Sequence, residues 1–292
     1  MRNNNTRNKT SERIIELSEH FSKRSNYWEE IYSKSKNPPN FMIYELDSRK
    51  EKALFAIDRF ANGRTINVLD IGCGTGHYME ELLIRNHNVT GIDVAFGMLM
   101  KAKQKLDKFN GKSHLIKSNI ENLPFNDNSF DVILCIGVIE YLPDIPKALK
   151  EINRVLKGDG IVILSAPNLY SLRFLTDPYY LIRGFQFLLK KLGIDIKKRA
   201  QTNYDVSMNV DFKNKRFSLK TLTKTFKEEK FRVFNLSSVA YGPYTFFQTP
   251  YFNLSTNIKI NNYLIRLSNK NKVRFLSYFA NRWIFELNKT NK

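Results

Sequence analysis

Two aspartates and three closely spaced glycines are the residues whose types and spacing best suit ligand binding. Asp70 ends an aliphatic run, and Gly72, Gly74 and Gly76 follow it. Glycines there accept a positive φ and carry no Cβ, so a flat ligand can lie directly against backbone N–H groups. Asp93 stands 23 residues after Asp70, where a carboxylate can accept hydrogen bonds from both hydroxyls of a ribose. The chemistry predicted is the binding of a nucleoside.

The glycine spacing indicates which kind of nucleoside ligand fits. A dinucleotide-binding loop reads G-x-G-x-x-G. Here the loop reads G-x-G-x-G, and His77 occupies the position of that third glycine. The pattern therefore favours a ligand without phosphates.

The elements that position these residues alternate between strands and helices. Apolar runs predict buried strands at Val68–Asp70, Asn88–Asp93, Ser113–Asn119, Phe130–Cys135 and Ile161–Ser165. Helical spacing of apolar residues follows the glycine loop from Tyr78, recurs over Phe96–Phe109, and recurs again before the turn at Lys157–Gly160. Such alternation predicts an α/β fold with a doubly wound, mostly parallel sheet.

Four motifs in this order resemble those of the class I S-adenosylmethionine (SAM) methyltransferases, in particular the methyltransferase type 11 and quinone-biosynthesis enzymes. They are the string Val68–Tyr78, the segment Lys117–Phe125, the strand Asn128–Cys135 with Ile139–Asp144, and the turn Leu156–Gly160. The resemblance is good over 66–166 and looser over 217–236. It implies a Rossmann-like sheet of seven strands in the order 3-2-1-4-5-7-6, with the last strand antiparallel.

The resemblance also implies a set of residues that bind SAM. They are Asp70, Gly72, Cys73, Gly74, Gly76, Asp93, Val94, Met98, Asn119, Ile120, Ile136 and Gly137. Asn119 departs from the family pattern, which has an acid at this position, and its amide oxygen can accept from the adenine amino group without charge. No metal is expected.

Glu140 and Tyr141 are the candidate catalytic residues. Transfer of a methyl group from a sulfonium needs mainly alignment, and a base only where the acceptor is a poorly ionised hydroxyl or an enolisable carbon. The quinone enzymes carry histidine where Tyr141 stands. The alternative role for Glu140 is a salt bridge to a lid or helix-terminus electrostatics, and His20 and His77 are further bases to consider.

The remaining chain predicts additions around this core. Residues 1–40 are predicted to form a polar tail and a helical lid, which ends at Asn37–Asn40. Residues 41–292 are predicted to form the methyltransferase domain, which begins with a helix at Tyr44–Ala61 and has its core at 66–166. An aromatic and basic cap at 167–216 and a second insertion at 243–281 are added to this core. A helix at Ser218–Glu229 and strands at Phe231–Leu236 and Arg282–Leu287 complete the pattern. Cys73 and Cys135 suggest a reducing cytoplasm, and they could lie near each other as apolar filler.

Charge distribution leaves the question of partners open. The chain carries a net charge of +19; residues 1–166 hold 24 Lys and Arg against 21 Asp and Glu, and residues 167–292 hold 23 against 7. A basic functional face and compositional drift both explain this asymmetry. The segment Tyr179–Leu192 can lie in a membrane interface or form a cap over the substrate, and no motif for nucleic-acid methylation follows the fourth strand.

The sequence therefore predicts a cytoplasmic SAM-dependent methyltransferase, with peripheral contact to the inner membrane face as an option. It would act on an oxygen or carbon, less readily a nitrogen, of a small-molecule or lipid-linked acceptor, and nucleic acid is an unlikely partner. The alternative is a non-catalytic or weakly active protein of the same fold that binds membrane or nucleic acid through its basic C-terminal half.

Overall fold

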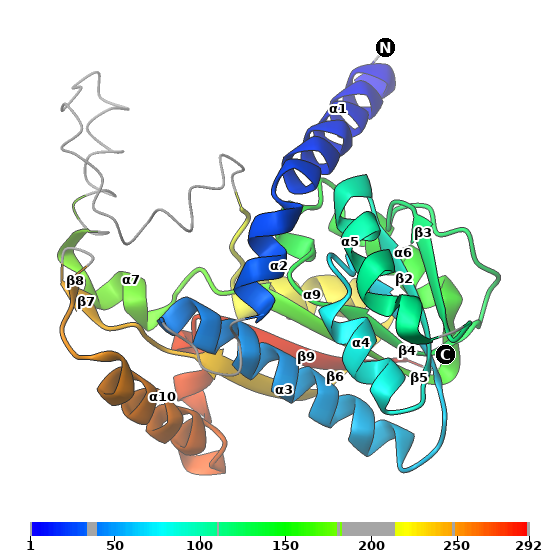
Figure 1. Cartoon of the computed structure of the whole chain (residues 1–292). Coiled ribbons are helices and arrows are strands. Elements are labelled where there is room, and N and C mark those ends of the chain that lie inside the picture. Colours follow the sequence, from blue (N-terminus) through cyan, green and yellow to red (C-terminus); the bar gives the residue numbers. More distant parts are fainter. Residues whose placement is uncertain are drawn as a thin grey trace.

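A seven-stranded sheet forms the centre of the computed structural model, which describes residues 2–33, 40–109, 111–179, 182, 214–246 and 249–290 (Figure 1). Its order is β3-β2-β1-β4-β5-β9-β6, and β9 pairs antiparallel with both neighbours. Since β9 is the last strand of the chain, the predicted order with an antiparallel final strand is confirmed. The strands of the sheet are β1 (Asn67–Ile71), β2 (Asn88–Asp93), β3 (Ser113–Lys117), β4 (Phe130–Cys135), β5 (Leu156–Pro167), β6 (Phe231–Ala240) and β9 (Arg282–Lys289).

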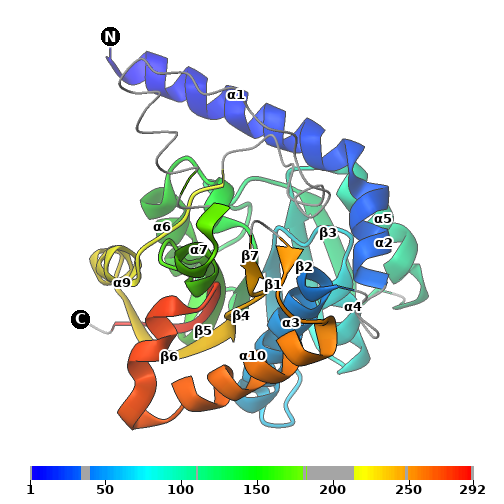
Figure 2. The same cartoon turned by 90° about the vertical axis from the view of Figure 1, so that its left-hand side faces the viewer.

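Helices cover both faces of the sheet (Figures 1 and 2). One apolar cluster packs α3, α4 and α5 against it, and the other packs α6 and α9 against the opposite face. The helices and short elements are α1 (Arg2–Lys23), α2 (Ser25–Ser33), α3 (Phe41–Ala61), α4 (His77–Ile84), α5 (Phe96–Leu106), η1 (Asp107–Phe109), η2 (Ile139–Tyr141), α6 (Ile145–Val155), α7 (Leu172–Thr176), α9 (Leu219–Glu228), β7 (Thr245–Phe246), β8 (Thr249–Pro250), α10 (Leu254–Ser268) and η3 (Asn271–Phe279).

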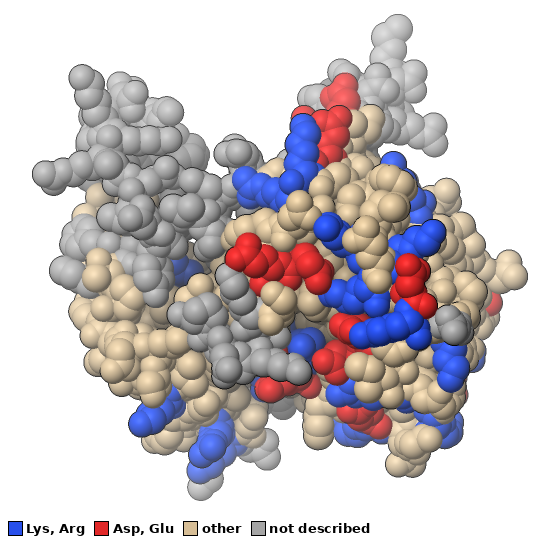
Figure 3. Space-filling model, in the orientation of Figure 1, with Lys and Arg blue, Asp and Glu red and all other residues tan. Residues whose placement is uncertain are grey.

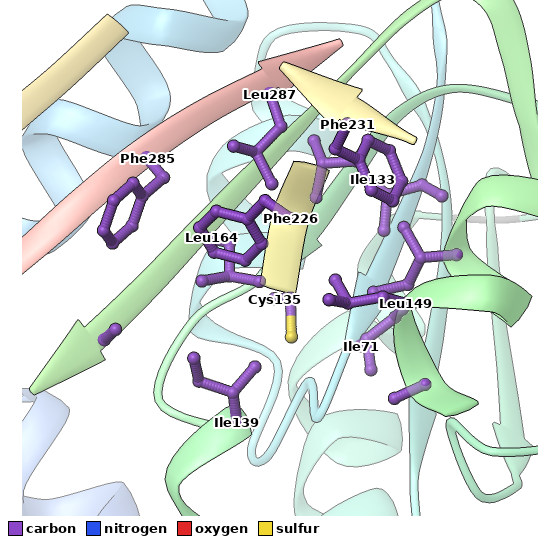
Figure 4. Packing of buried hydrophobic residues seen from close by; sticks show 14 of the residues in the cluster. Ile71, Ile133, Cys135, Ile139, Leu149, Leu164, Phe226, Phe231, Phe285 and Leu287 are labelled. Carbon is purple, nitrogen blue, oxygen red and sulfur yellow. The ribbon is translucent and has the colours of Figure 1, made fainter. Parts of the chain in front are cut away.

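Alternation along the central strands explains why there are two clusters. Ile133 and Cys135 of β4 point into the cluster under α6 and α9, whereas Val132 and Leu134 point into the other. Figure 4 shows the cluster under α6 and α9, in which Phe226 of α9 packs among residues of the strands. Cys73 and Cys135 are free, buried thiols, and they pack into different apolar clusters.

Several element boundaries differ from the sequence-based expectations. Helix α1 begins at Arg2, since no glycine or proline interrupts the polar stretch expected to lack structure. Strand β5 begins at Leu156 and takes in the predicted turn at 157–160 as an irregularity in its pairing with β4. The predicted cap at 167–216 and the segment Tyr179–Leu192 lie largely outside the described residues, as does most of the break at Asn37–Asn40. Among the described helices, none is long and apolar enough to cross a membrane.

Gly91 lies in the middle of β2 at a point of close packing. A Cβ at this position would lie 2.3 Å from Met79 Sδ and 2.9 Å from Cys73 Sγ. Both side chains are buried, so there is no space into which they can move freely. The glycine therefore allows α4 and the glycine loop to approach the sheet.

Replacing Gly91 with alanine is expected to lower the free energy of unfolding by ~1–3 kcal/mol, the usual cost of overpacking a buried site. Gly158→Ala is the matched control, because a Cβ there meets nothing within 4 Å, and its expected effect is below ~0.5 kcal/mol. Urea unfolding of the two variants measures both values. Equal effects would show that the contact with Met79 does not limit this position.

Candidate functional site

A cavity of about 620 Å³ lies at the carboxyl ends of β1, β2 and β4. This edge is where open α/β sheets bind ligands, because the crossovers diverge there. Helices α1, α2 and α3 supply a second wall. The residues that line it and bear on the argument are Leu17, Phe21, Tyr27, Trp28, Tyr32, Glu45, Arg49, Gly72, Gly74, Asp93, Val94, Met98, Asn119, Ile120, Ile136, Gly137, Glu140, Tyr141 and Arg282.

Asp93 fixes the glycine loop. Its Oδ2 accepts a hydrogen bond from the Gly74 N–H at 3.0 Å, and its Oδ1 accepts from the Ala95 N–H at 2.8 Å. Burial raises the pKa of Asp93, and these two hydrogen bonds oppose the rise. The carboxylate thus joins the end of β2 to the loop after β1, and the loop holds Gly74 at φ 54° with open space where a Cβ would stand.

Asp70 is a buried acid that lacks a partner on one oxygen. Its side chain is 2% exposed, and its Oδ2 has no hydrogen-bond partner among the described residues. Burial, together with the charge of Asp93, raises the pKa of Asp70 to about 8. A cationic group brought to this carboxylate would compensate for its burial.

Nine of the twelve predicted cofactor-binding residues line the cavity, and Asp70, Cys73 and Gly76 do not. Asp70 is buried in β1, and the loop is held by Asp93 through the Gly74 N–H. Cys73 packs beside Gly91, and Gly76, at φ 80°, precedes α4 and lies against Ala102. Asn119 lines the cavity, but its Oδ1 already accepts from the Glu121 N–H at 3.2 Å.

Glu140 has one occupied and one free carboxylate oxygen. Arg282 Nη1 donates to Glu140 Oε1 at 2.7 Å, and Arg282 Nε lies 3.6 Å from Glu45 Oε1. Burial alone would lower the pKa of Arg282, but the two carboxylates outweigh it and raise that pKa. Glu140 is 2% exposed, and its Oε2 has no partner among the described residues. Glu140 therefore pairs with strand β9 of the sheet and not with a lid, and the pair leaves an acceptor at the cavity wall.

Tyr141 is the weaker of the two catalytic candidates. Burial and the charge of Glu140 raise the pKa of its phenol to about 12, so it stays protonated near neutral pH and is suited to donate a hydrogen bond. Neither His20 nor His77 lines the cavity. Metal chemistry finds no support among the described residues, where no cluster of three His, Cys, Asp or Glu side chains could hold an ion.

Arg49 is a cavity residue that the sequence did not single out. It lies on α3, is 7% exposed, and its Nε has no hydrogen-bond partner among the described residues. A Cβ on Gly137 would lie 3.4 Å from Arg49 Nη1, so the guanidinium passes beside the loop after β4. In the sequence, Arg49 was one basic residue of a helix pattern, and only packing reveals that it is buried.

His77 and two serines attach the N-terminal helices to the core. Glu29 of α2 lies 3.0 Å from Lys105 Nζ and 3.3 Å from His77 Nε2. Burial and the nearby Lys105 lower the pKa of His77 to about 4, so the ring is neutral. On α1, Ser18 Oγ donates to the Val94 carbonyl at 2.8 Å, and the Gly97 N–H donates to Ser22 Oγ at 3.2 Å. The residue in place of the third glycine therefore docks a lid.

Comparison with known proteins agrees with this geometry. The model of a methyltransferase domain family matches residues 69–164. An uncharacterized protein of Methanocaldococcus jannaschii is 35% identical over 169 residues, 57% of this chain and 61% of that protein. The demethylmenaquinone methyltransferase of Staphylococcus haemolyticus is 30% identical over 151 residues, 50% of this chain and 62% of the enzyme. The chain thus spans about three-fifths of these relatives.

Solved structures show the same fold. The magnesium protoporphyrin IX methyltransferase of Synechocystis, solved with S-adenosylhomocysteine (SAH), superposes with a TM-score of 0.58 over 95% of this chain and all of that one, at 14% identity. At this identity the likeness concerns the fold alone. It agrees with the order of the strands in the sheet.

The unpartnered carboxyl group of Asp70 leads to a prediction about stability. Because the pKa of Asp70 is higher in the folded protein than its ordinary value of 3.8, the folded state keeps a proton that the unfolded chain releases. Stability therefore falls as the pH rises from about 4 to 8. Asp70→Asn removes this loss, so its advantage over the wild type should grow by on the order of 1–3 kcal/mol between about pH 5 and 8.

Urea unfolding of the ligand-free protein at the two pH values measures that difference. Asp159→Asn, at an exposed carboxylate, is the control and should give the same difference from the wild type at both. Parallel curves for Asp70→Asn and the wild type would contradict the raised pKa.

Proposed function

We propose that the chain is a class I S-adenosylmethionine-dependent methyltransferase, which binds SAM in the cavity and transfers its methyl group to a small-molecule or lipid-linked acceptor. The match of a methyltransferase domain model to residues 69–164 supports this proposal. The observation that carries the proposal is the loop that Asp93 holds open at Gly74, with a carboxylate beside it and no phosphate-binding glycine at position 77. This cradle fits a nucleoside joined to an amino acid.

The nucleoside part would lie against β2 and β3. Asp93 Oδ1 and Oδ2 each accept one backbone hydrogen bond, and a carboxylate oxygen has a second lone pair for a ribose hydroxyl. Met98 and Ile120 supply apolar surface for the adenine ring. Asn119 retains its Nδ2 donor and a second lone pair on Oδ1, so it can still contact the ring edge.

The amino-acid part of SAM carries an ammonium and a carboxylate, and the cavity region offers an unpartnered group of each opposite charge. Asp70 has a free buried oxygen, and Arg49 has a free buried nitrogen. Arg49 and Asp70 both influence the pKa of the Tyr32 phenol on α2. This is expected if the two side chains face the same part of the cavity region. A zwitterion placed there would satisfy both groups at once.

The acceptor would lie between this region and the N-terminal helices. When bound, SAM supplies a methyl group already activated on a sulfonium, so the protein has mainly to align the reactants. Phe21, Tyr27 and Trp28 line that side of the cavity, which favours an apolar or aromatic acceptor. Glu140 Oε2 is the group that would accept a proton or a hydrogen bond from the acceptor, while Arg282 keeps the carboxylate in place.

Isothermal titration with SAH and with 5′-methylthioadenosine, which lacks the amino-acid part, tests the assignment of the cavity. Arg49→Gln and Asp70→Asn should weaken SAH binding by ~10–100-fold, because hydrogen bonds to charged groups contribute about 1.5–3 kcal/mol, and leave methylthioadenosine binding unchanged. Asp93→Asn should weaken both ligands.

Arg64→Gln is the control for the first of these variants, since Arg64 is exposed just after α3 and should bind SAH as the wild type does. If the wild-type protein bound neither ligand, the alternative of a non-catalytic protein with a methyltransferase fold would be supported. If Arg49→Gln lost the same affinity for SAH and for methylthioadenosine, Arg49 would not be the residue that binds the amino-acid part.

Glu140→Gln should leave SAH affinity intact and lower methyl transfer by ~10²-fold or more, the range for losing a general base. Glu121→Gln is a matched control, because Glu121 is equally buried, pairs with Lys147 at 3.3 Å and also has one unpartnered oxygen, yet does not line the cavity. Transfer of labelled methyl from SAM to a panel of phenols and demethylated quinones gives the rates. An unchanged rate in Glu140→Gln would restrict this residue to holding Arg282.

A further inference from the structure

Helix α10 turns polar residues toward the protein. Asn257 and Asn261 are 2% and 0% exposed, and they accept hydrogen bonds from the backbone of the preceding segment: Tyr244 N–H donates to Asn257 Oδ1 at 3.2 Å, and Tyr241 N–H donates to Asn261 Oδ1 at 2.8 Å. The outward face of α10 then carries Lys259, Tyr263 and Arg266, which all lie exposed. This distribution differs from that of an ordinary surface helix, which buries its apolar side.

Exposed aromatic residues surround this outward face. Each of the five is between 44 and 62% exposed, and they come from the segment after β8, from α10 and from η3: Tyr251, Phe252, Tyr263, Phe275 and Tyr278. Figure 2 shows α10 and the β7–β8 hairpin on the side of the molecule that faces the viewer. We call the five aromatic residues, together with Lys259, Arg266 and Lys270, the α10 surface.

The charge of the α10 surface has one sign. No aspartate or glutamate occurs from residue 230 to 285, and this stretch holds eight lysines and arginines. In Figure 3 the surface over α10, at the lower left, shows blue groups among tan ones, whereas blue and red alternate over the opposite half of that face. Toward α3 the surface ends near Glu51, whose charge acts on Tyr44.

A small groove lies beside the α10 surface. It has a volume of about 380 Å³ and is lined by Asn40, Phe41, Pro250, Tyr251, Phe252, Asn253, Leu254 and Asn257. Asn40 and Phe41 also line the large cavity, so the α10 surface and the cavity lie on adjoining parts of the molecule.

We propose that the α10 surface docks the protein on an anionic lipid bilayer. Amphipathic aromatic rings settle at the boundary between head groups and acyl chains, and Lys and Arg beside them are attracted to anionic lipids. The exposed phenylalanines favour lipid over nucleic acid. The docking does not rest on the proposed methyl transfer.

Flotation of the full-length protein with vesicles tests the docking. The protein should bind vesicles containing about one-third phosphatidylglycerol and bind pure phosphatidylcholine vesicles weakly, and about 0.5 M salt should release most of it. One basic residue near an anionic surface contributes about fivefold to partitioning (~1 kcal/mol). The combined Lys259→Gln, Arg266→Gln and Lys270→Gln variant should therefore partition about 100-fold less, and Tyr263→Ser with Phe275→Ser should weaken binding as well.

The matched control is the combined Lys220→Gln, Lys224→Gln and Lys227→Gln variant on α9, which removes three exposed charges on the face of the sheet opposite α3. It should lose less than about threefold. Equal losses in both variants, no binding to either vesicle, or loss of single-stranded RNA binding with vesicle binding retained would each overturn the proposal. SAH titration of the α10 variants should match the wild type, which separates this outcome from a failure of the proposed function.

Discussion

The hydrogen bond from the Gly74 N–H to Asp93 is the contact on which the whole site depends. It joins the ends of β1 and β2, which the parallel register already places side by side, with Ile71 opposite Ile92. The Gly72 and Cys73 amides donate to the carbonyl of Ile92 in the same place. These bonds hold the loop in a shape that only glycine adopts easily, and the space they leave open becomes the cavity. The same arrangement brings the Asp93 carboxylate near Asp70. Burial, together with the charge of Asp93, raises the pKa of Asp70.

The two arginines that line the cavity, Arg49 and Arg282, differ in whether a carboxylate compensates their charge. Arg282 reaches Glu140 and Glu45, so its charge is compensated inside the protein. Arg49 forms no ion pair with the described residues, although it is more deeply buried than Arg282. A buried guanidinium without a counter-ion is unfavourable, and the protein retains it at the edge of a cavity rather than in the core. This imbalance is what an anionic ligand group would correct.

Short-range patterns allowed the sheet and the cofactor side of the cavity to be predicted from the sequence. The strands, the glycine loop and Asp93 are local features, because period and turn chemistry act within a few residues. The acceptor side could not be predicted in this way. Glu140 acquires its partner from Arg282, which follows 142 positions later, and Arg49 is a cavity residue only because α3 packs over the loop after β4. The role of His77 depended similarly on Glu29 of a separate helix.

Basic residues of the C-terminal half occupy particular faces of the described helices. Drift in composition changes residues without regard to which face of a helix they occupy. On α10, asparagines with specific backbone partners occupy the buried face, and lysine, arginine and tyrosine occupy the exposed one. Elsewhere basic residues have acidic neighbours: Lys105 pairs with Glu29, and Lys157 pairs with Asp131. Acids are absent from 230 to 285 while aromatic residues stay exposed there, and this combination is the basis for the proposed docking.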